Sequence, residues 1–271
     1  MASSASSDRS NPVALVTGAS SGIGEALAPC FAAAGHDLVL VARSADKLQV
    51  LARQLADDHG IKAWVEPADL AQPGAAARLA ATLRRKRRRI DVLVNNAGVL
   101  VQGPFVGMKR GEAGRMIDLN ISGLTALLDE LLPAMVARGS GRVLNVASIA
   151  AFQPVPTLAT YAATKAYVLS LTESLAEELR GTGVTITALC PGITATPMLG
   201  QAASANARLS ELPAFLVGDV HDVARQGFEA CMRGDVICVP GVVNRAAMVA
   251  SRGTPKWLVR RIGGWIGRQA L

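Results

Sequence analysis

Two residues four positions apart, Tyr161 and Lys165, give this chain its clearest chemical signal, and Ser148 lies thirteen residues before the tyrosine. Positions i and i+4 share one face of a helix, so this spacing predicts a Lys165 ammonium beside the Tyr161 phenol. A free tyrosine has a pKa of about 10, and a nearby positive charge favours the phenolate. We therefore expect a phenol whose pKa is lowered by Lys165, with the Ser148 hydroxyl available to hold an oxyanion. Taken alone, the spacing also fits an amphipathic helix with one packed tyrosine and one solvated lysine.

A glycine-rich turn follows residues 13–17, a short β-branched apolar run typical of a buried parallel strand. Gly18 allows a tight turn, Gly22 lets the backbone approach a pyrophosphate, and Gly24 lets the following helix pack closely on the strand. The N–H groups and the dipole at the helix start can hold phosphates. The GxxxGxG spacing differs from the common GxGxxG, and an ordinary glycine-rich turn is the alternative, but the flanking strand and helix favour a dinucleotide site. Its predicted residues are Gly18, Ser20, Ser21, Gly22, Ile23 and Gly24.

Pro29 falls inside the helix predicted after this turn. Proline lacks an N–H donor and clashes with the preceding turn, so we expect the helix to kink or end there. No functional role for this proline follows from the sequence.

Arg43, followed by Ser44, ends the second predicted strand, residues 37–43. Dinucleotide sites that bind the ribose 2′-hydroxyl place an acidic residue about 20 positions beyond the glycines. A guanidinium at that place can pair with a 2′-phosphate, which a carboxylate would repel. The sequence therefore predicts NADP(H) in preference to NAD(H), with NAD(H) still possible. A surface arginine at a strand end is the alternative.

A length of 271 residues, half of them hydrophobic, predicts one α/β domain with a large core. We expect a disordered tail over residues 1–11, a single catalytic domain over 12–243 and a basic, apolar extension over 244–271. The four cysteines form no CxxC pair and the three histidines no metal spacing, so free thiols in a reducing compartment and no metal site are predicted. The cytoplasm is the expected location. No secretion signal is visible, and we expect no segment that spans a membrane.

The net charge of +7 comes almost entirely from one run, residues 84–89, which carries six positive charges. Removing that run leaves a net charge of +1. The run lies at the C-terminal end of a predicted helix, where the dipole favours cations, so a solvated helix end is the main interpretation. A local contact with a polyanion is the alternative. No nucleic-acid-binding module accompanies the run, so no nucleic-acid partner is predicted.

Seven strand-like segments alternate, for the most part, with helical stretches, a pattern typical of a parallel sheet with helices on both faces. They are residues 13–17, 37–43, 63–66, 90–94, 142–147, 184–189 and 236–239. Ligands of such sheets bind beyond the carboxyl ends of the strands. Polar or glycine-containing positions follow several of these ends, at Asp69, Asn95, Ser148 and Pro191–Gly192. We expect them to meet in a single site.

Taken together, these residues resemble the short-chain dehydrogenase/reductase family over about residues 12–241. Residues 17–24 are similar to its cofactor turn, and Asp69–Leu70 is similar to its adenine-contacting pair. Residues 95–98, which include Asn96, Ala97 and Gly98, resemble its NNAG segment. Pro191, Gly192, Thr194 and Thr196 lie in a stretch similar to the one that holds the nicotinamide amide. Asn120, Ser148, Tyr161 and Lys165 match its catalytic four. The resemblance implies a three-layer Rossmann-type, doubly wound sheet in strand order 3-2-1-4-5-6-7.

The same resemblance implies hydride transfer between a nicotinamide cofactor and a carbonyl or secondary alcohol. Tyr161 would act as general acid in reduction and as base in reverse, and Ser148 would hydrogen-bond the carbonyl oxygen. Lys165 would lower the pKa of Tyr161 and contact the nicotinamide ribose, and Asn120 would hold a water in a proton relay. A cofactor-sensing protein that binds the dinucleotide without turnover is the alternative function.

Residues 194–217 are expected to form a substrate-covering loop with few charges. Its large apolar residues, together with Phe152 and Val155, suggest an apolar small-molecule substrate, although the same side chains could simply pack the loop. These loop residues are Met198, Leu199, Leu209, Leu212, Phe215 and Leu216.

The family commonly forms homodimers or homotetramers through the helix that carries the tyrosine. Here that helix is expected at 159–180, and four of its leucines are available for burial: Leu169, Leu171, Leu175 and Leu179. The extension at 244–271 could be a membrane-surface helix, a lid or an oligomer contact. Packing against the domain or a partner subunit is favoured over membrane contact.

Overall fold

The computed structural model describes residues 11–200, 217–242, 244–246 and 248. Residues 1–10, most of the expected substrate loop, including Leu209, Leu212, Phe215 and Leu216, and nearly all of the 244–271 extension lie outside the described residues. Predictions for those segments therefore stay predictions.

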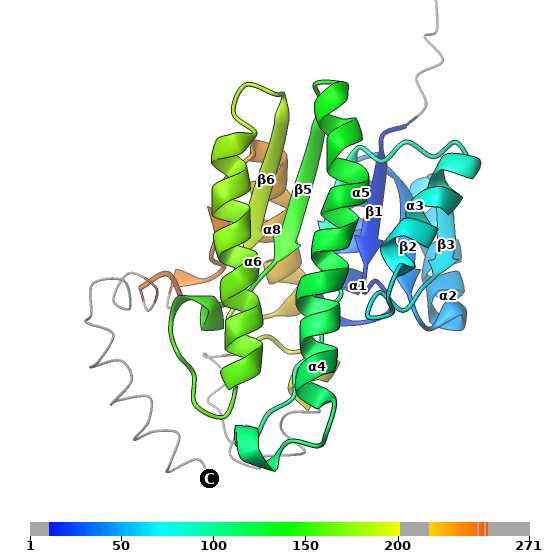
Figure 1. Cartoon of the computed structure of the whole chain (residues 1–271). Coiled ribbons are helices and arrows are strands. Elements are labelled where there is room, and N and C mark those ends of the chain that lie inside the picture. Colours follow the sequence, from blue (N-terminus) through cyan, green and yellow to red (C-terminus); the bar gives the residue numbers. More distant parts are fainter. Residues whose placement is uncertain (1–10, 201–216, 243, 247, 249–271) are drawn as a thin grey trace, which may run out of the picture.

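Seven parallel strands form one sheet in the order β3-β2-β1-β4-β5-β6-β7, which confirms the predicted topology (Figure 1). The strands are β1 (Val13–Thr17), β2 (Asp37–Ala42), β3 (Ala63–Pro67), β4 (Val92–Asn95), β5 (Gly141–Val146), β6 (Val184–Leu189) and β7 (Ile237–Cys238). Strands β1 and β6 have the predicted bounds, and the others differ from the prediction by one or two residues at an end. The carboxyl ends of the central strands meet at one edge, where the predicted site residues follow them.

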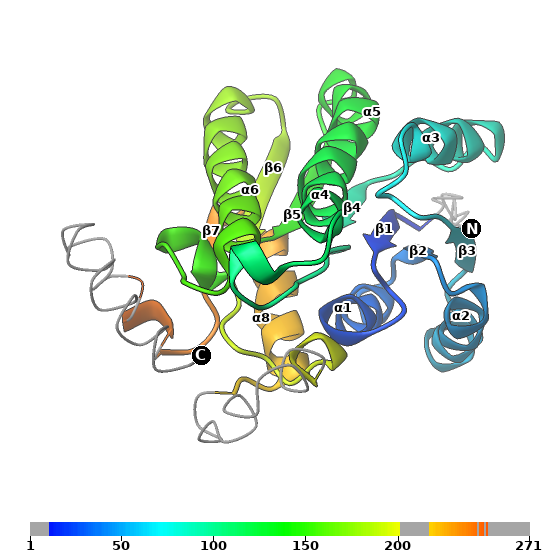
Figure 2. The same cartoon turned by 60° about the horizontal axis from the view of Figure 1, so that its bottom comes forward.

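Helices cover both faces of the sheet and make three layers (Figure 2). Helices α3 (Ala75–Arg85), α5 (Leu124–Ala137) and α6 (Ala159–Glu178) pack on one face, and α1 (Gly22–Ala33), α2 (Ala45–His59) and α8 (Val220–Arg233) pack on the other. Within β1, Val13 and Leu15 join one core while Ala14 and Val16 join the other. Because successive strand side chains point to opposite faces, two buried faces require a continuous apolar run, as the sequence has.

The sequence predicted that the helix would kink or end at Pro29. Helix α1 runs through Pro29 to Ala33, so a helix end there is wrong, and a kink stays a prediction. Phe31 and Ala32, both beyond the proline, are buried in the core between α1 and the sheet. An interior proline costs about 3 kcal/mol, and the burial of a phenylalanine recovers about 1.5–3 kcal/mol of that. Tertiary packing therefore keeps the helix intact where the local sequence alone would end it.

A continuous helical segment joins α4 (Glu112–Ile117), a π-helical turn at Asp118–Gly123 and α5. Within the described chain, this segment is the one helix long and apolar enough, by length and composition alone, to cross a membrane. The prediction that no segment spans a membrane stays a prediction, because length and composition alone do not test it. Core helices of soluble proteins pass the same test, and the apolar side chains of this one are partly used in packing: Met116, Leu124, Leu127 and Met135 are buried.

The basic run does begin at a helix C-terminus, because α3 ends at Arg85. Carboxylates of the same chain, however, take up much of its charge. Lys86 and Arg88 both pair with Glu66, and the Arg88 guanidinium lies 4.4 Å from the centroid of the Trp64 ring. Arg84 pairs with Glu130 and Arg89 with Asp91. The run is thus only in part a solvated helix end.

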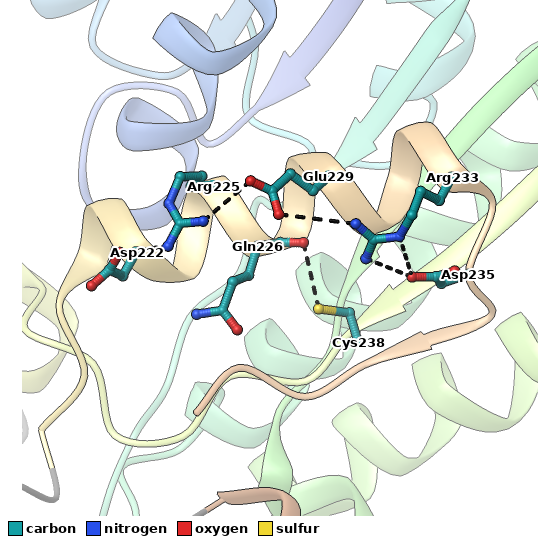
Figure 3. Close-up of polar contacts among 7 residues, drawn as sticks. All are labelled: Asp222, Arg225, Gln226, Glu229, Arg233, Asp235 and Cys238. Carbon is teal, nitrogen blue, oxygen red and sulfur yellow. Dashed lines mark hydrogen bonds and ion pairs between the residues drawn. The ribbon is translucent and has the colours of Figure 1, made fainter. Parts of the chain in front are cut away.

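The exposed face of α8 carries a second set of charges, arranged as a ladder (Figure 3). Arg225 pairs with Asp222 at 2.9 Å and with Glu229 at 3.1 Å. Arg233 lies 3.9 Å from Glu229 and 2.8 Å from Asp235. We call these five residues the α8 ladder.

Candidate active site

A cavity of about 500 Å³ opens at the carboxyl ends of the strands and brings together eighteen of the twenty predicted cofactor and catalytic positions. The predicted residues that line it are Gly18, Ser20, Ser21, Gly22, Ile23, Arg43, Asp69, Leu70, Asn96, Ala97, Gly98, Ser148, Tyr161, Lys165, Pro191, Gly192, Thr194 and Thr196. Gly24 and Asn120 do not line it and lie one layer behind its wall.

The glycine-rich turn is held against the NNAG segment by Thr17. The Thr17 hydroxyl accepts hydrogen bonds from the backbone N–H groups of Asn96 and Ala97, at 2.9 and 3.0 Å, and donates to the Val94 carbonyl at 3.1 Å. Gly18 has φ of +65°, and a Cβ there would lie 2.9 Å from the Ala97 Cα. A side chain at position 18 would therefore be both strained and crowded. The two segments form one wall of the cavity.

Helix α1 points its N-terminus at this cavity. Its N-cap residue, Ser21, makes no side-chain capping hydrogen bond, and Gly22 begins the helix with φ of +62°. The first N–H groups of a helix have no partner within the helix, so an uncapped start can receive an anion. Gly24 lies behind the turn, where a Cβ would come within 2.5 Å of the Gly18 carbonyl oxygen. Close packing of helix on turn, rather than contact with a ligand, accounts for that glycine.

Arg43 and Asp69 lie just past the ends of β2 and β3, which are hydrogen-bonded neighbours in register. Arg43 is exposed. The Asp69 carboxylate accepts from the Ala71 N–H at 3.2 Å and from the Arg115 guanidinium at 3.3 Å. Desolvation is the largest influence on Asp69 and acts to raise its pKa, but these hydrogen bonds and the charges of Arg115 and Arg43 outweigh it, so its pKa lies below the usual value. The group stays ionised at neutral pH.

Tyr161 and Lys165 lie one helical turn apart on α6, as predicted, and both are buried with Ser148 against the cavity. The Lys165 ammonium donates to the Val146 carbonyl at 2.7 Å and lies 5.8 Å from the centroid of the Tyr161 ring. Gly98 lies beside it, and a Cβ there would make an ordinary contact of 3.5 Å with the Lys165 nitrogen but a tighter one of 3.2 Å with the Asn120 amide oxygen. The amphipathic alternative, with a solvated lysine, is therefore wrong.

The expected lowering of the tyrosine pKa is not found. Burial raises the pKa of Tyr161, and a hydrogen bond from Ser148, which acts in the opposite direction, does not offset it. Burial also lowers the pKa of Lys165 to about 8, partly opposed by Cys190. Desolvation disfavours the charged form of both groups, and the lysine is directed at a carbonyl rather than at the phenol oxygen. A protonated phenol is a suitable proton donor at neutral pH.

Asn120 is buried within the π-helical turn, and its amide is fully engaged. It donates to the Val99 carbonyl at 3.0 Å and to the Thr164 hydroxyl at 3.1 Å, and it accepts from the Val99 N–H at 2.9 Å. Thr164 in turn donates to the Tyr161 carbonyl at 2.8 Å. The side chain thus ties the loop after β4 to the tyrosine helix.

The segment after β6 closes the far side of the cavity. The Ile149 N–H, next to Ser148, donates to the Pro191 carbonyl at 3.0 Å. The Thr194 hydroxyl donates to the Gly192 carbonyl at 3.0 Å, and Thr194 forms a parallel bridge with Gly218. Asn244 packs on Gly192, where a Cβ would lie 2.5 Å from the Asn244 side chain. This segment is therefore fixed by contacts on both sides.

The remaining wall is mostly apolar. Val155, Met198 and Leu199 line it, as expected, together with Leu100 and Leu158. Phe152 does not, because its ring packs against the core on the α5–α6 face of the sheet. The 3-10 turn at Ile149–Phe152 directs Ile149 and Ala150 to the cavity instead.

Several residues at or beside the site were not predicted from the sequence, and three of them have long polar side chains: Gln102 and Gln153 line the cavity, and Arg115 pairs with Asp69. None belongs to a spaced motif. Arg115 and Asp69 are 46 residues apart, so no local pattern links them.

Comparison with known proteins gives a consistent picture. Residues 12–207 match the family model described as short chain dehydrogenase. The oxidoreductase UcpA of Escherichia coli is 38% identical over 186 residues, which are 68% of this chain and 70% of that protein. A short-chain dehydrogenase from Sphingobium yanoikuyae, solved in complex with NADPH, is 34% identical with a TM-score of 0.77, over 89% of this chain and 93% of that one. A bulky-bulky ketone specific alcohol dehydrogenase from Comamonas testosteroni is 30% identical with a TM-score of 0.74, over 90% and 95% of the two chains.

Proposed function

Because this chain belongs to the short-chain dehydrogenase family, and so to a family of oxidoreductases, we propose that it is an NADPH-dependent reductase of ketones or aldehydes, able to oxidise the corresponding alcohol in reverse. One observation carries the proposal. A single cavity holds a buried serine, tyrosine and lysine at one end and an uncapped helix start with an exposed arginine at the other. The dimensions and lining of that cavity suit a dinucleotide with a small substrate beside it.

The residues present fit NADP(H). The backbone of Gly18–Gly24 and the uncapped start of α1 would hold the diphosphate, and Arg43 would pair with the 2′-phosphate. Asp69–Leu70 would contact the adenine, and Asn96–Gly98 would border the cofactor. Pro191, Gly192, Thr194 and Thr196 would hold the nicotinamide amide. Tyr161 and Lys165 would contact the second ribose. NAD(H) would fit the same cavity without the Arg43 contact. When bound, the reduced nicotinamide supplies the hydride.

The side chains of this chain then manage the oxygen and its proton. Ser148 donates a hydrogen bond to the substrate carbonyl oxygen, a contact that strengthens as negative charge develops there. Tyr161, kept protonated by burial, donates its proton to that oxygen as general acid. Lys165 supplies positive charge behind the phenol, so that the phenolate left after proton transfer is stabilised. Asn120 holds the loop after β4 and the tyrosine helix in register, and its role in a proton relay through a water stays a prediction of the family resemblance.

The substrate is proposed to be an apolar carbonyl compound. The cavity has an apolar wall, formed by Val155, Leu158, Met198 and Leu199. Two polar side chains, the amides of Gln102 and Gln153, also line the cavity. The Comamonas enzyme, which resembles this chain in fold, is described as specific for bulky-bulky ketones. That similarity supports a roomy apolar pocket.

The proposal is tested by following NADPH absorbance with a panel of ketones and aldehydes that ranges from acetone to aryl and alicyclic ketones. We expect turnover that increases with the apolar bulk of the substrate and that is faster with NADPH than with NADH. Tight binding of NADPH with no turnover on any member would instead favour the sensor alternative. Absence of NADPH binding would refute both.

Association into a homodimer or homotetramer remains a proposal. The residues available for such a contact, however, differ from those expected from the sequence. Leu169 and Leu179 are part of the core of one chain, and Leu171 and Leu175 pack against it. Leu169 and Leu179 are therefore not free for a partner, whereas Leu171 and Leu175 are only partly buried. Ile117 of α4, Val136 of α5 and Tyr167 of α6 are exposed and would add to such a contact.

A further inference from the structure

Two arginines that come from different parts of the fold act on the charge of the Asp69 carboxylate. Arg43 follows β2, one strand away from Asp69 in the sheet, and lines the same cavity wall. Arg115 reaches Asp69 from α4, with a guanidinium nitrogen 3.3 Å from one carboxylate oxygen. Arg115 does not line the cavity. The three side chains thus bring two positive charges and one negative charge to the same end of the cavity, with Arg115 behind its wall.

The position of the Asp69 carboxylate is fixed by backbone packing. The Leu70 carbonyl lies against Gly123 of the π-helical turn, where a Cβ would come within 2.5 Å of the carbonyl oxygen. The Ala71 N–H donates to the other side of the carboxylate at 3.2 Å. Arg115 lies eight residues before Gly123 on the same continuous helical segment. The segment that holds the Asp69 backbone therefore also supplies the cation for its side chain.

The negative charge of Asp69 would oppose the binding of the 2′-phosphate of NADPH at Arg43. An unpaired carboxylate repels a phosphate, and it also attracts the Arg43 guanidinium away from that phosphate. NADH has no 2′-phosphate and would not experience this repulsion. A cation paired with Asp69 removes most of the repulsion between this carboxylate and the 2′-phosphate, because an ion pair has little net field at a distance.

We propose that Arg115 is a specificity residue for NADPH over NADH: by pairing with Asp69, it prevents that carboxylate from opposing the binding of the 2′-phosphate at Arg43. This inference rests on the proposed function. It assigns cofactor selectivity to a side chain outside the cavity. It also predicts that selectivity depends on the helical segment Glu112–Gly123 as well as on the ends of the strands.

Calorimetric titration of NADPH and NADH into the full-length protein, without substrate, tests the proposal independently of turnover. Arg115→Met should weaken NADPH binding about three- to tenfold at low salt and change NADH binding by less than about twofold. Arg115→Lys, which retains the charge, should keep most of the NADPH preference. The loss in Arg115→Met should shrink as salt is raised, since screening weakens an electrostatic effect but leaves a packing effect unchanged.

A double variant separates electrostatics from damage to the fold. Removing the negative charge as well, in Arg115→Met with Asp69→Asn, should restore the ratio of NADPH to NADH affinity to within about twofold of the unsubstituted protein, even if both affinities fall. Equal weakening of both cofactors in Arg115→Met, or a ratio that the second substitution does not restore, would overturn the inference. If the unsubstituted protein binds neither cofactor, the proposed function itself fails, and the two failures are thereby distinct.

Discussion

The α8 ladder and the cluster around Tyr161 are both built from polar side chains, but they lie in opposite environments. In the ladder, Arg225 and its partners are about half exposed, and water can replace each contact. In the cluster, Asn120, Ser148, Tyr161 and Lys165 are each less than 10% exposed, so water cannot replace a contact that is lost. Exposed ion pairs contribute little because solvent screens them, whereas a buried polar group without a partner is costly. The number of polar contacts is therefore a poor guide to their importance, and burial is a better one.

The strongest test of this contrast is Tyr161→Phe, which removes one buried hydroxyl and keeps the ring. We expect turnover to fall by about 10²- to 10⁴-fold, because proton donation by a positioned acid contributes that much. NADPH affinity, measured by calorimetry, should change little and so report an intact site. A variant that keeps more than about a tenth of the original rate would contradict the role of Tyr161.

Arg43→Asp tests whether an exposed charge contributes strongly to binding when it contacts a ligand. Arg43 is exposed, as Arg225 of the ladder is, but it lines the cavity. We expect NADPH to bind about 10- to 100-fold more weakly, since a charge-assisted contact is replaced by repulsion, while NADH binding is largely kept. Equal losses for the two cofactors, measured side by side, would show that Arg43 does not contact a 2′-phosphate.

Lys165→Met tests the cost of a buried charge. The unfolded chain keeps Lys165 protonated up to about pH 10.5, whereas the folded chain releases this proton near pH 8. Between those values the unfolded state binds more protons, so the stability contributed by this site rises with pH, and below about pH 8 the folded protein bears the full penalty. We expect Lys165→Met to be inactive and yet about 1–3 kcal/mol more stable at pH 7, after allowing for the hydrogen bond lost at Val146.

Chemical denaturation at pH 7 and at pH 10 measures that effect. The gain in stability should be largest at pH 7 and should decrease toward pH 10. A variant that is less stable than the original protein at both pH values would mean that Lys165 stabilises the fold through its contacts, contrary to this expectation.

Arg225→Ala should have the smallest effect of the four. It removes both of the 2.9 and 3.1 Å contacts in the middle of the α8 ladder, yet we expect the melting temperature to shift by less than about 2 °C and turnover to stay unchanged. A larger shift in melting temperature would show that the ladder acts as a network, and the contrast with the buried cluster would weaken.

Local patterns predicted the sheet well, because each central strand is a short apolar run with two buried faces. The bounds of Val13–Thr17 and Val184–Leu189 follow directly from such runs. The shared helical face of Tyr161 and Lys165 also follows from spacing alone. The helix through Pro29 could not be predicted in this way, because the packing that preserves it comes from distant segments.

The charge interactions and the pKa shifts of the site could not be predicted from the sequence. Spacing places Lys165 near Tyr161, but it does not show that the ammonium is directed at the Val146 carbonyl, nor that burial controls both pKa values. The pairing of Arg115 with Asp69 likewise depends on how the loop after β3 meets α4. Phe152 was expected in the cavity because it closely follows Ser148, and the 3-10 turn directs it elsewhere.

The π-helical turn at Asp118–Gly123 has a consequence for the direction in which α4 presents its side chains. One residue of an α-helix corresponds to a rotation of about 100° about the axis. The wider turn therefore sets the angular phase of Glu112–Ile117 relative to Leu124–Ala137. If the same residues formed a regular α-helix, Arg115 would turn by roughly that angle, away from Asp69, and the buried Met116 would turn toward solvent. The π-helical turn thus determines which side chains of α4 face this end of the cavity.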